Sequence, residues 1–229
     1  MAVSLTWHGH STLALEIDGA RLLVDPFLDD NPACSLRAAE ANADCLLVTH
    51  GHFDHVADAA AIARRTGAAV LANFEIGQWL ARQGVPAEQI LGMNLGGRVV
   101  RPFGRVTMTL AHHSSSLPDG SYGGSAAGFL LEAGGKRIYL AGDTALFLDM
   151  KLLGLGGLDL AVLPIGDLYT MGPDDAIEAV KLLNARRVVP CHYNTWPPIA
   201  QDAAAWAERV RRETAAEPIV LQPGQTTRL

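Results

Sequence analysis

The sequence predicts an α+β fold in which two mixed β-sheets pack face to face and helices cover their outer faces. The chain has 229 residues and is 49% hydrophobic, which is enough for a sizeable core. Each half begins with short β-rich runs joined by tight turns and then alternates between helical and β patterns. Two such halves bury the apolar faces of both sheets when the sheets pack against each other.

The first half opens with three β-rich runs. Asp18-Gly19, between the second and third runs, is typical of a tight hairpin turn. The hydrophobic period then changes, and two helix-like segments flank a short β-rich run. The predicted strands of this half are residues 3–7, 12–17, 21–25, 45–49 and 69–72, and the predicted helices are 57–65 and 74–83.

The second half repeats this order, with Gly134-Gly135 as its hairpin turn. Before it, Arg98, Arg101 and Arg105 cluster around turn glycines and Pro102, which predicts a solvated hairpin. The predicted strands are residues 106–111, 126–132, 136–141, 158–163, 187–190 and 219–222, and the predicted helices are 146–153, 173–183 and 201–212. No linker-like stretch divides the chain, so we expect residues 1–229 to form one domain.

One six-residue run, His50-Gly51-His52-Phe53-Asp54-His55, directly follows an apolar, strand-like stretch. A lone histidine in a loop is usually an ordinary polar residue, but no packing or capping rule explains this alternation of three imidazoles and a carboxylate. Histidine and aspartate are the donor set that suits zinc or a similar first-row metal. One tetrahedral ion with an open position needs only three ligands, so the run predicts either a closed structural site or a pair of ions.

The other histidines also follow strand-like runs. Ends of several strands brought to one edge of a sheet are how α/β folds assemble a site. The eight histidines occupy four places, which are His8 with His10, the six-residue run, His112 with His113, and His192.

Two aspartates follow predicted strands. Asp143 is either a turn or cap residue before the next helix, or a metal ligand in line with the histidine sites. Asp25 either begins an Asp-Pro turn or accepts a hydrogen bond from a ligating imidazole and so fixes its tautomer. Alternation along residues 106–113 places His112 and His113 on opposite faces of the strand and leaves open which of them meets the metals.

Taken in order, these motifs resemble those of the metallo-β-lactamase superfamily, whose fold is a four-layer αββα sandwich. The resemblance covers Trp7 to about Thr195. Within this superfamily, the chain resembles most specifically a branch of short metal-dependent hydrolases. This branch is distantly similar to the ascorbate-phosphate lactonases. The motifs that carry it are Gly9-His10-Ser11, Asp25-Pro26-Phe27, the His-x-His-x-Asp-His run, His113-Ser114-Ser115-Ser116, Gly142-Asp143-Thr144 and His192-Tyr193-Asn194-Thr195.

The resemblance implies a role for each matching residue. Besides binding metal, Asp54 would orient the attacking hydroxide. His10 and His112 would lie beside the ligands or contact substrate. The His-Ser-Ser-Ser match favours His113 over His112 as the ligand. The implied ligands are His50, His52 and His113 for one ion, Asp54, His55 and His192 for the other, and Asp143 as the bridge.

The function that follows is metal-dependent hydrolysis. Two divalent ions, by default Zn²⁺ and alternatively Mn²⁺ or Fe²⁺, would share a hydroxide that cleaves a small ester, lactone, amide or phosphodiester. The alternatives are a nuclease or RNA-processing enzyme of the same fold, and a catalytically silent metal-binding regulatory protein. No Gly-x-Ser-x-Gly elbow is present to support a serine nucleophile.

Composition restricts the partners and the compartment. A net charge of -6 argues against a nucleic-acid surface, which needs a dense basic face. We expect neither a signal peptide nor a membrane span, and three cysteines without CxxC spacing fit a reducing compartment. These observations predict a cytoplasmic protein with a small-molecule substrate, which could form a homo-oligomer.

Two loops are candidates for a substrate lid, residues 114–124 and 167–172. Their serines and tyrosines predict a polar, neutral lining with few cations. Asp174 and Asp175, in the first turn of the following helix, oppose an anion there. We therefore expect the site to disfavour a highly phosphorylated substrate.

Overall fold

Two seven-stranded mixed sheets form the centre of the protein in the computed structural model, which describes residues 3–229. Met1 and Ala2 of the predicted domain lie outside the described residues. The first sheet contains, in spatial order, β14 (Thr226–Arg228), β1 (Val3–Trp7), β2 (Leu13–Ile17), β3 (Ala20–Val24), β4 (Cys45–Leu47), β5 (Ala69–Asn73) and β6 (Ile90–Met93). The second contains β13 (Glu217–Pro218), β12 (Arg187–Cys191), β11 (Leu160–Pro164), β10 (Lys136–Leu140), β9 (Ala127–Ala133), β8 (Gly104–Leu110) and β7 (Arg98–Arg101).

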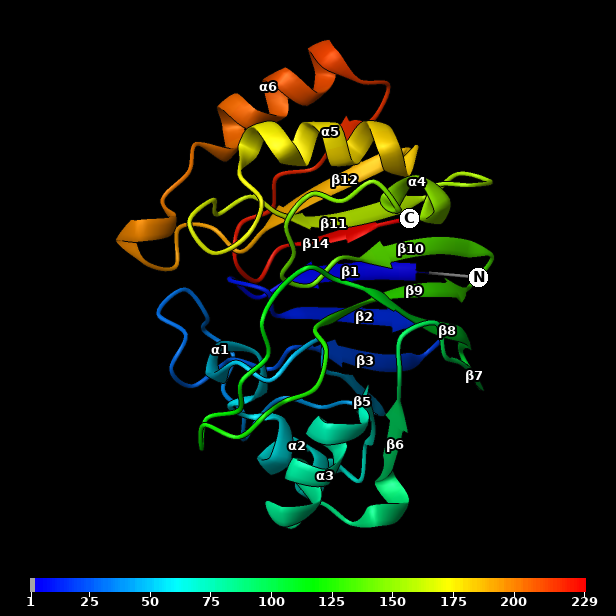
Figure 1. Cartoon of the computed structure of the whole chain (residues 1–229), viewed down its shortest axis with the longest axis vertical. Coiled ribbons are helices and arrows are strands. Elements are labelled where there is room, and N and C mark those ends of the chain that lie inside the picture. Colours follow the sequence, from blue (N-terminus) through cyan, green and yellow to red (C-terminus); the bar gives the residue numbers. More distant parts are fainter. Residues whose placement is uncertain (1–2) are drawn as a thin grey trace.

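The helices lie outside the two sheets. Figure 1 shows α5 and α6 at one end of the molecule, α1, α2 and α3 at the other, and the sheets between them. This arrangement confirms the predicted αββα sandwich. The helices are α1 (Phe53–Val56), α2 (Ala59–Thr66), α3 (Phe74–Arg82), α4 (Met150–Leu153), α5 (Pro173–Leu183) and α6 (Ala203–Glu213), with 3-10 turns at Ala87–Gln89 and Pro197–Ile199.

Alternation along the strands divides the core between two apolar clusters. On β3, Leu22 and Val24 join the large cluster that contains residues of both sheets. Leu23, which points to the opposite face, packs in a second cluster with Ile62 of α2 and Leu80 of α3. Side chains that alternate in this way let one sheet bury both of its faces.

The strand directions bring the predicted site residues to one edge of each sheet. In the first sheet β1 and β3 are each antiparallel to β2, and β3 is parallel to β4. The strands β1, β3 and β4 therefore end on the same side of this sheet. In the second sheet β8 and β10 are each antiparallel to β9, and β10, β11 and β12 are parallel. The site residues follow the carboxyl ends of these strands.

Two predicted helices are shorter than expected. Of residues 57–65, the first two lie between α1 and α2, and the rest belong to α2, which begins at Ala59. The chain turns there because the Asp58 carboxylate accepts the backbone N–H groups of Leu28 and Asp29, at 2.7 and 3.2 Å. Of residues 146–153 only Met150–Leu153 is helical, since the Ala145 N–H is bonded to the carbonyl of His112 at 3.1 Å.

The carboxyl-terminal strand prediction, residues 219–222, is wrong. The last strand of the second sheet is Glu217–Pro218, and the chain then turns between Gln222 and Gln225. It crosses to the first sheet, where Thr226–Arg228 pairs with β1. The hairpin predicted around Pro102 is confirmed, because Arg98–Arg101 pairs with Gly104–Leu110.

Candidate metal centre

The His-x-His-x-Asp-His run leaves the sheet after β4 and enters a short helix. His50 lies in the segment that follows the strand, whereas Asp54 and His55 belong to α1, so the run includes both a loop and the start of a helix. The helix brings Asp54 and His55 together with His10 and His192, and the ring of His55 also lies 4.0 Å from that of His50. Local backbone geometry thus divides the run between two groups of side chains.

The first group consists of His50, His52 and His113. One ring nitrogen of each lies within 4.8 Å of those of the others. His50 Nε2 and His52 Nδ1 are 3.0 Å apart, and His50 is fully buried. The structure therefore brings His113, and not its neighbour His112, to the predicted first ion.

His112 lies elsewhere. It is exposed, and its ring stacks on Phe147 with centroids 5.1 Å apart and planes 16° apart. Its backbone N–H donates to Thr144 Oγ1 at 2.9 Å, which connects this loop to the segment that carries Asp143. The structure supports a packing role for His112.

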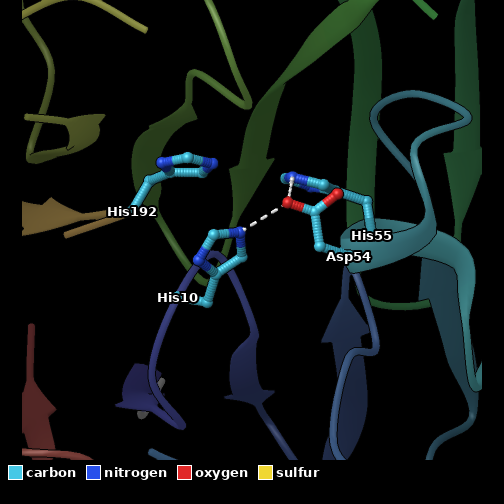
Figure 2. Close-up of side chains that lie close together, drawn as sticks. All are labelled: His10, Asp54, His55 and His192. Carbon is cyan, nitrogen blue, oxygen red and sulfur yellow. Dashed lines mark hydrogen bonds and ion pairs between the residues drawn. The ribbon is translucent and has the colours of Figure 1, made fainter. Parts of the chain in front are cut away.

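The second group consists of Asp54, His55 and His192, and His10 joins it. The ligand atoms of all four residues lie within 4.8 Å of one another. Figure 2 shows His10 between Asp54 and His192: its Nε2 is 2.9 Å from Asp54 Oδ2, and its ring centroid is 4.0 Å from that of His192. From the sequence we expected His10 only to lie beside the ligands or to contact substrate. In the structure, one of its ring nitrogens lies within 4.8 Å of the ligand atoms of the other three residues.

Asp143 lies between the two groups. Its Oδ2 is 3.9 Å from His50 Nε2 and 3.7 Å from His113 Nε2, which belong to the first group. The same oxygen is 3.4 Å from His55 Nε2 and 3.0 Å from His192 Nε2, which belong to the second. One carboxylate oxygen thus faces imidazoles of both groups.

Gly142 makes this position of Asp143 possible. Its φ is 62°, a conformation that glycine adopts without steric cost. A Cβ atom there would lie 2.7 Å from the carbonyl oxygen of Ala127 and 2.9 Å from Thr49 Cβ. The Gly-Asp-Thr motif is therefore required by close backbone packing as well as by the carboxylate that it presents.

Burial and mutual charge shift the pKa values of the site. Burial, and after it the nearby His55, lowers the pKa of His50 well below its usual value. Burial opposes the charged form of His55 too, but the carboxylates of Asp143 and Asp25 raise its pKa well above the usual value. Burial would raise the pKa of Asp143, yet His192 and His55 lower it well below the usual value. The metal-free site thus holds an ionised carboxylate among imidazoles.

The residues present fit divalent metal ions. His55 Nε2 is buried and accepts or donates no hydrogen bond, although it faces Asp143 and Asp54. A proton and a metal ion compete for such a nitrogen. Imidazoles and carboxylates together suit zinc and its first-row neighbours, so both groups could hold an ion with Asp143 shared between them.

Asp25 orients His55. His55 Nδ1 donates to Asp25 Oδ2 at 2.8 Å, which leaves Nε2 to face the site. Asp25 also accepts the backbone N–H of Thr49 at 2.8 Å and the Thr49 hydroxyl at 2.6 Å. The hydrogen bond anticipated for Asp25 is therefore present, and it fixes both the tautomer and the rotation of the ring.

An Asp25→Asn variant is expected to bind metal about 10–100-fold more weakly, since its amide no longer offers His55 a charged acceptor. Asparagine tolerates the φ of 45° at this position, so the backbone is retained. Chelator competition would measure the loss, with Asp44→Asn as a control at an exposed aspartate. Unchanged affinity in Asp25→Asn would contradict this role.

His10 is fixed from both sides. Its Nδ1 is 2.8 Å from the Thr195 hydroxyl, and its Nε2 is 2.9 Å from Asp54. Burial and the nearby His192 lower the pKa of His10 to about 4, so the ring is neutral at pH 7. The Thr195 hydroxyl can then donate to Nδ1 while Nε2–H donates to Asp54.

A cavity of about 620 Å³ opens onto the two groups. Ser114, Ser116 and Tyr169 of the two candidate loops line it as expected, and apolar side chains contribute further to its walls. Sequence reasoning missed four of these, namely Phe53, Leu117, Pro118 and Trp196. Phe53 could have been noticed, since it lies inside the ligand run with no role in binding metal. The other lining residues are His52, Asp54, His113, Ser114, Ser116, Asp143, Tyr169 and His192.

The loop of residues 114–124 is anchored to the body of the protein. Asn73 Nδ2 donates to the carbonyls of Gly123 and Ser125 at 2.7 and 2.9 Å. Trp79 Nε1 donates to Asp119 Oδ2 at 3.1 Å, and Leu117 is buried in the cluster beside α2 and α3. These contacts make the loop a fixed wall of the cavity and not the flexible lid that we expected.

The comparisons with known proteins agree with this fold and site. Residues 20–193 match the model of a β-lactamase superfamily domain. The UPF0173 metal-dependent hydrolase of Thermus thermophilus is 48% identical over 227 residues, which cover 99% of each chain. That of Symbiobacterium thermophilum is 49% identical over 228 residues, 98% of this chain and 99% of the relative.

A solved structure is also similar over its whole length. The metallo hydrolase of the archaeon Ignicoccus hospitalis superimposes with a TM-score of 0.90 at 36% identity, covering 100% of this chain and 99% of that one. The chain therefore belongs to the metallo-β-lactamase superfamily and, within it, to the UPF0173 metal-dependent hydrolases. Across residues 3–229, none of the helices combines the length and the apolar character needed to cross a membrane.

Proposed function

We propose that the protein is a dinuclear metal-dependent hydrolase that cleaves a small ester, lactone, amide or phosphodiester. The observation that carries this proposal is the position of Asp143, whose Oδ2 lies 3.0–3.9 Å from imidazole nitrogens of both groups. One ion in each group with a shared carboxylate accounts for all seven predicted ligands. A single ion would leave several of these buried donors without a partner.

Two divalent ions, for which zinc is our first candidate, would supply an acidified water molecule and polarise the oxygen of the substrate. The chain's own residues would position these reactants. Burial would raise the pKa of Asp54, but its hydrogen bond with His10 and the nearby His55 lower the pKa below the usual value. Its carboxylate is therefore ionised at neutral pH and can accept a hydrogen bond from the attacking water.

His10 would hold Asp54 in this role. The order Thr195, His10, Asp54 connects the carboxylate to the segment that follows β12. The fixed loop of residues 114–124 would exclude bulk water from one side of the reacting centre. We propose that these residues orient one water molecule toward a carbonyl or phosphoryl centre in the cavity.

Hydrolysis by metal-stripped and metal-reconstituted protein tests the proposal. Purified protein, stripped with a chelator and reloaded with Zn²⁺, Mn²⁺ or Fe²⁺, is assayed against panels of esters, lactones, amides and phosphodiesters. We expect activity toward at least one class only in the loaded protein. Two bound ions without hydrolysis of any class would contradict the proposal and favour a metal-binding regulatory protein.

A further inference from the structure

The cavity over the metal centre has an aromatic wall formed by Phe53, Tyr169 and Trp196. These residues come from α1, from the segment after β11 and from the segment after β12. Phe53 and Tyr169 are each 55% exposed. Single exposed aromatic side chains are common on protein surfaces. Three that line one concave site form an apolar surface, which is typical of a ligand-binding site.

Contacts beneath this wall hold it in place. The ring of Phe27, which is fully buried, lies 5.9 Å from Phe53 and 6.0 Å from Trp196, measured between centroids. Phe53 and Trp196 are themselves 6.0 Å apart, and Trp196 is 4.9 Å from the His10 ring. Rings locked in this way lose little conformational entropy when a planar ligand packs against them.

The loop of residues 114–124 adds two apolar side chains to the lining, beside Ser114 and Ser116. Leu117 and Pro118 belong to the anchored loop, and Leu117 is 3% exposed. A ligand group that enters between this loop and the aromatic wall would exchange water for apolar contacts on both faces. The cavity volume of about 620 Å³ is large enough for a drug-sized molecule.

Charge in the cavity disfavours an anionic ligand group. Among residues 3–229, neither lysine nor arginine lines it, whereas the carboxylates of Asp54 and Asp143 do. A carboxylate or phosphate away from the metals would therefore lack a cationic partner and would meet like charge.

We infer that the substrate is an uncharged ester, lactone or amide with an aromatic group close to the scissile bond, which packs against Phe53 and Tyr169. This inference rests on the proposed hydrolytic function and narrows its substrate class. The apolar side chains supply the surface on which the aromatic group packs, and the predicted metal ligands lie at the reacting end, with Ser114 and Ser116 as further polar lining. Such a division is typical of sites for small apolar ligands.

Four ethyl or benzyl esters of similar intrinsic reactivity test the inference on the zinc-loaded protein. Ethyl phenylacetate and benzyl acetate place one ring on the acyl or the alcohol side, and ethyl acetate lacks the ring. Ethyl 4-carboxyphenylacetate adds only a charge. We expect kcat/KM for at least one neutral aromatic ester to exceed that for ethyl acetate by about tenfold or more, and the carboxylate to remove the advantage.

Matched variants locate the effect. Phe53→Ala is expected to lower kcat/KM for the preferred aromatic ester by about tenfold more than it lowers kcat/KM for ethyl acetate. Phe74→Ala is the control, because Phe74 is also the first residue of a helix and is 58% exposed, but does not line the cavity. Equal kcat/KM for esters with and without the ring, or a preference for the charged ester, would overturn the inference and leave the proposed hydrolysis intact.

A binding measurement separates the two proposals when no ester is cleaved. 4-Phenyl-2-butanone carries the ring and a carbonyl but no bond to hydrolyse, and its binding to the zinc-loaded protein can be followed by NMR titration. Binding that is weakened in Phe53→Ala and retained in Phe74→Ala would support the aromatic site even if hydrolysis fails. Absence of binding to the unmodified protein would overturn the inference.

Discussion

Replacement of Asp143 by asparagine is expected to abolish hydrolysis and to remove at least one metal ion from the protein. The carboxylate is 2% exposed and faces imidazoles of both groups, so no other side chain can substitute for its charge. Loss of a shared ligand should cost more than the roughly 100-fold upper limit found for partners outside the ligand set. Metal content by elemental analysis and kcat/KM for the best substrate give the two readouts.

Asp175→Asn provides the control for this charge change, because Asp175 is exposed in the first turn of α5. It should retain both metal ions and most of the activity. Circular dichroism of both variants separates loss of metal from loss of fold. Full metal content together with near-normal activity in Asp143→Asn would contradict a shared role for this residue.

The adjacent residues His112 and His113 give the second large effect. His113→Ala is expected to lose the ion of the first group, because His50, His52 and the shared Asp143 would leave this ion one protein ligand short. Activity should fall by more than about 100-fold for the same reason. Metal content at saturating zinc and kcat/KM are the measurements.

His112→Ala is the internal control. Its ring stacks on Phe147 at the surface, so we expect both ions to remain and stability to fall only slightly. A variant of His113 with full metal content, or a variant of His112 without it, would reverse the assignment of the ligand. Because the two positions are neighbours, general damage to the loop would affect both variants alike.

The interior strands could be predicted from the sequence because each has apolar residues on at least one face. Strands β1, β2 and β3, for example, alternate between buried residues and more exposed ones or are buried throughout their second half. The errors concern strands at the sheet edges, since β6 and β14 were not predicted and β13 was misplaced, whereas β7 was expected only as part of a hairpin. Arg98–Arg101 and Thr226–Arg228 are largely exposed, so backbone pairing and not apolar burial defines them.

The site was predictable to the extent that it depends on strand ends. Because β10, β11 and β12 are parallel and end at one edge of the second sheet, Asp143 and His192, which follow β10 and β12, approach one another. The apolar wall could not be found in this way. Phe53 and Trp196 are distant in the sequence, and only the tertiary packing around Phe27 brings their rings together.

The central claim is that two metal ions share Asp143. Elemental analysis of the full chain, purified and equilibrated with excess zinc before removal of free metal, tests it most directly. We predict two equivalents of zinc per chain. One equivalent or none at saturation would contradict the dinuclear centre.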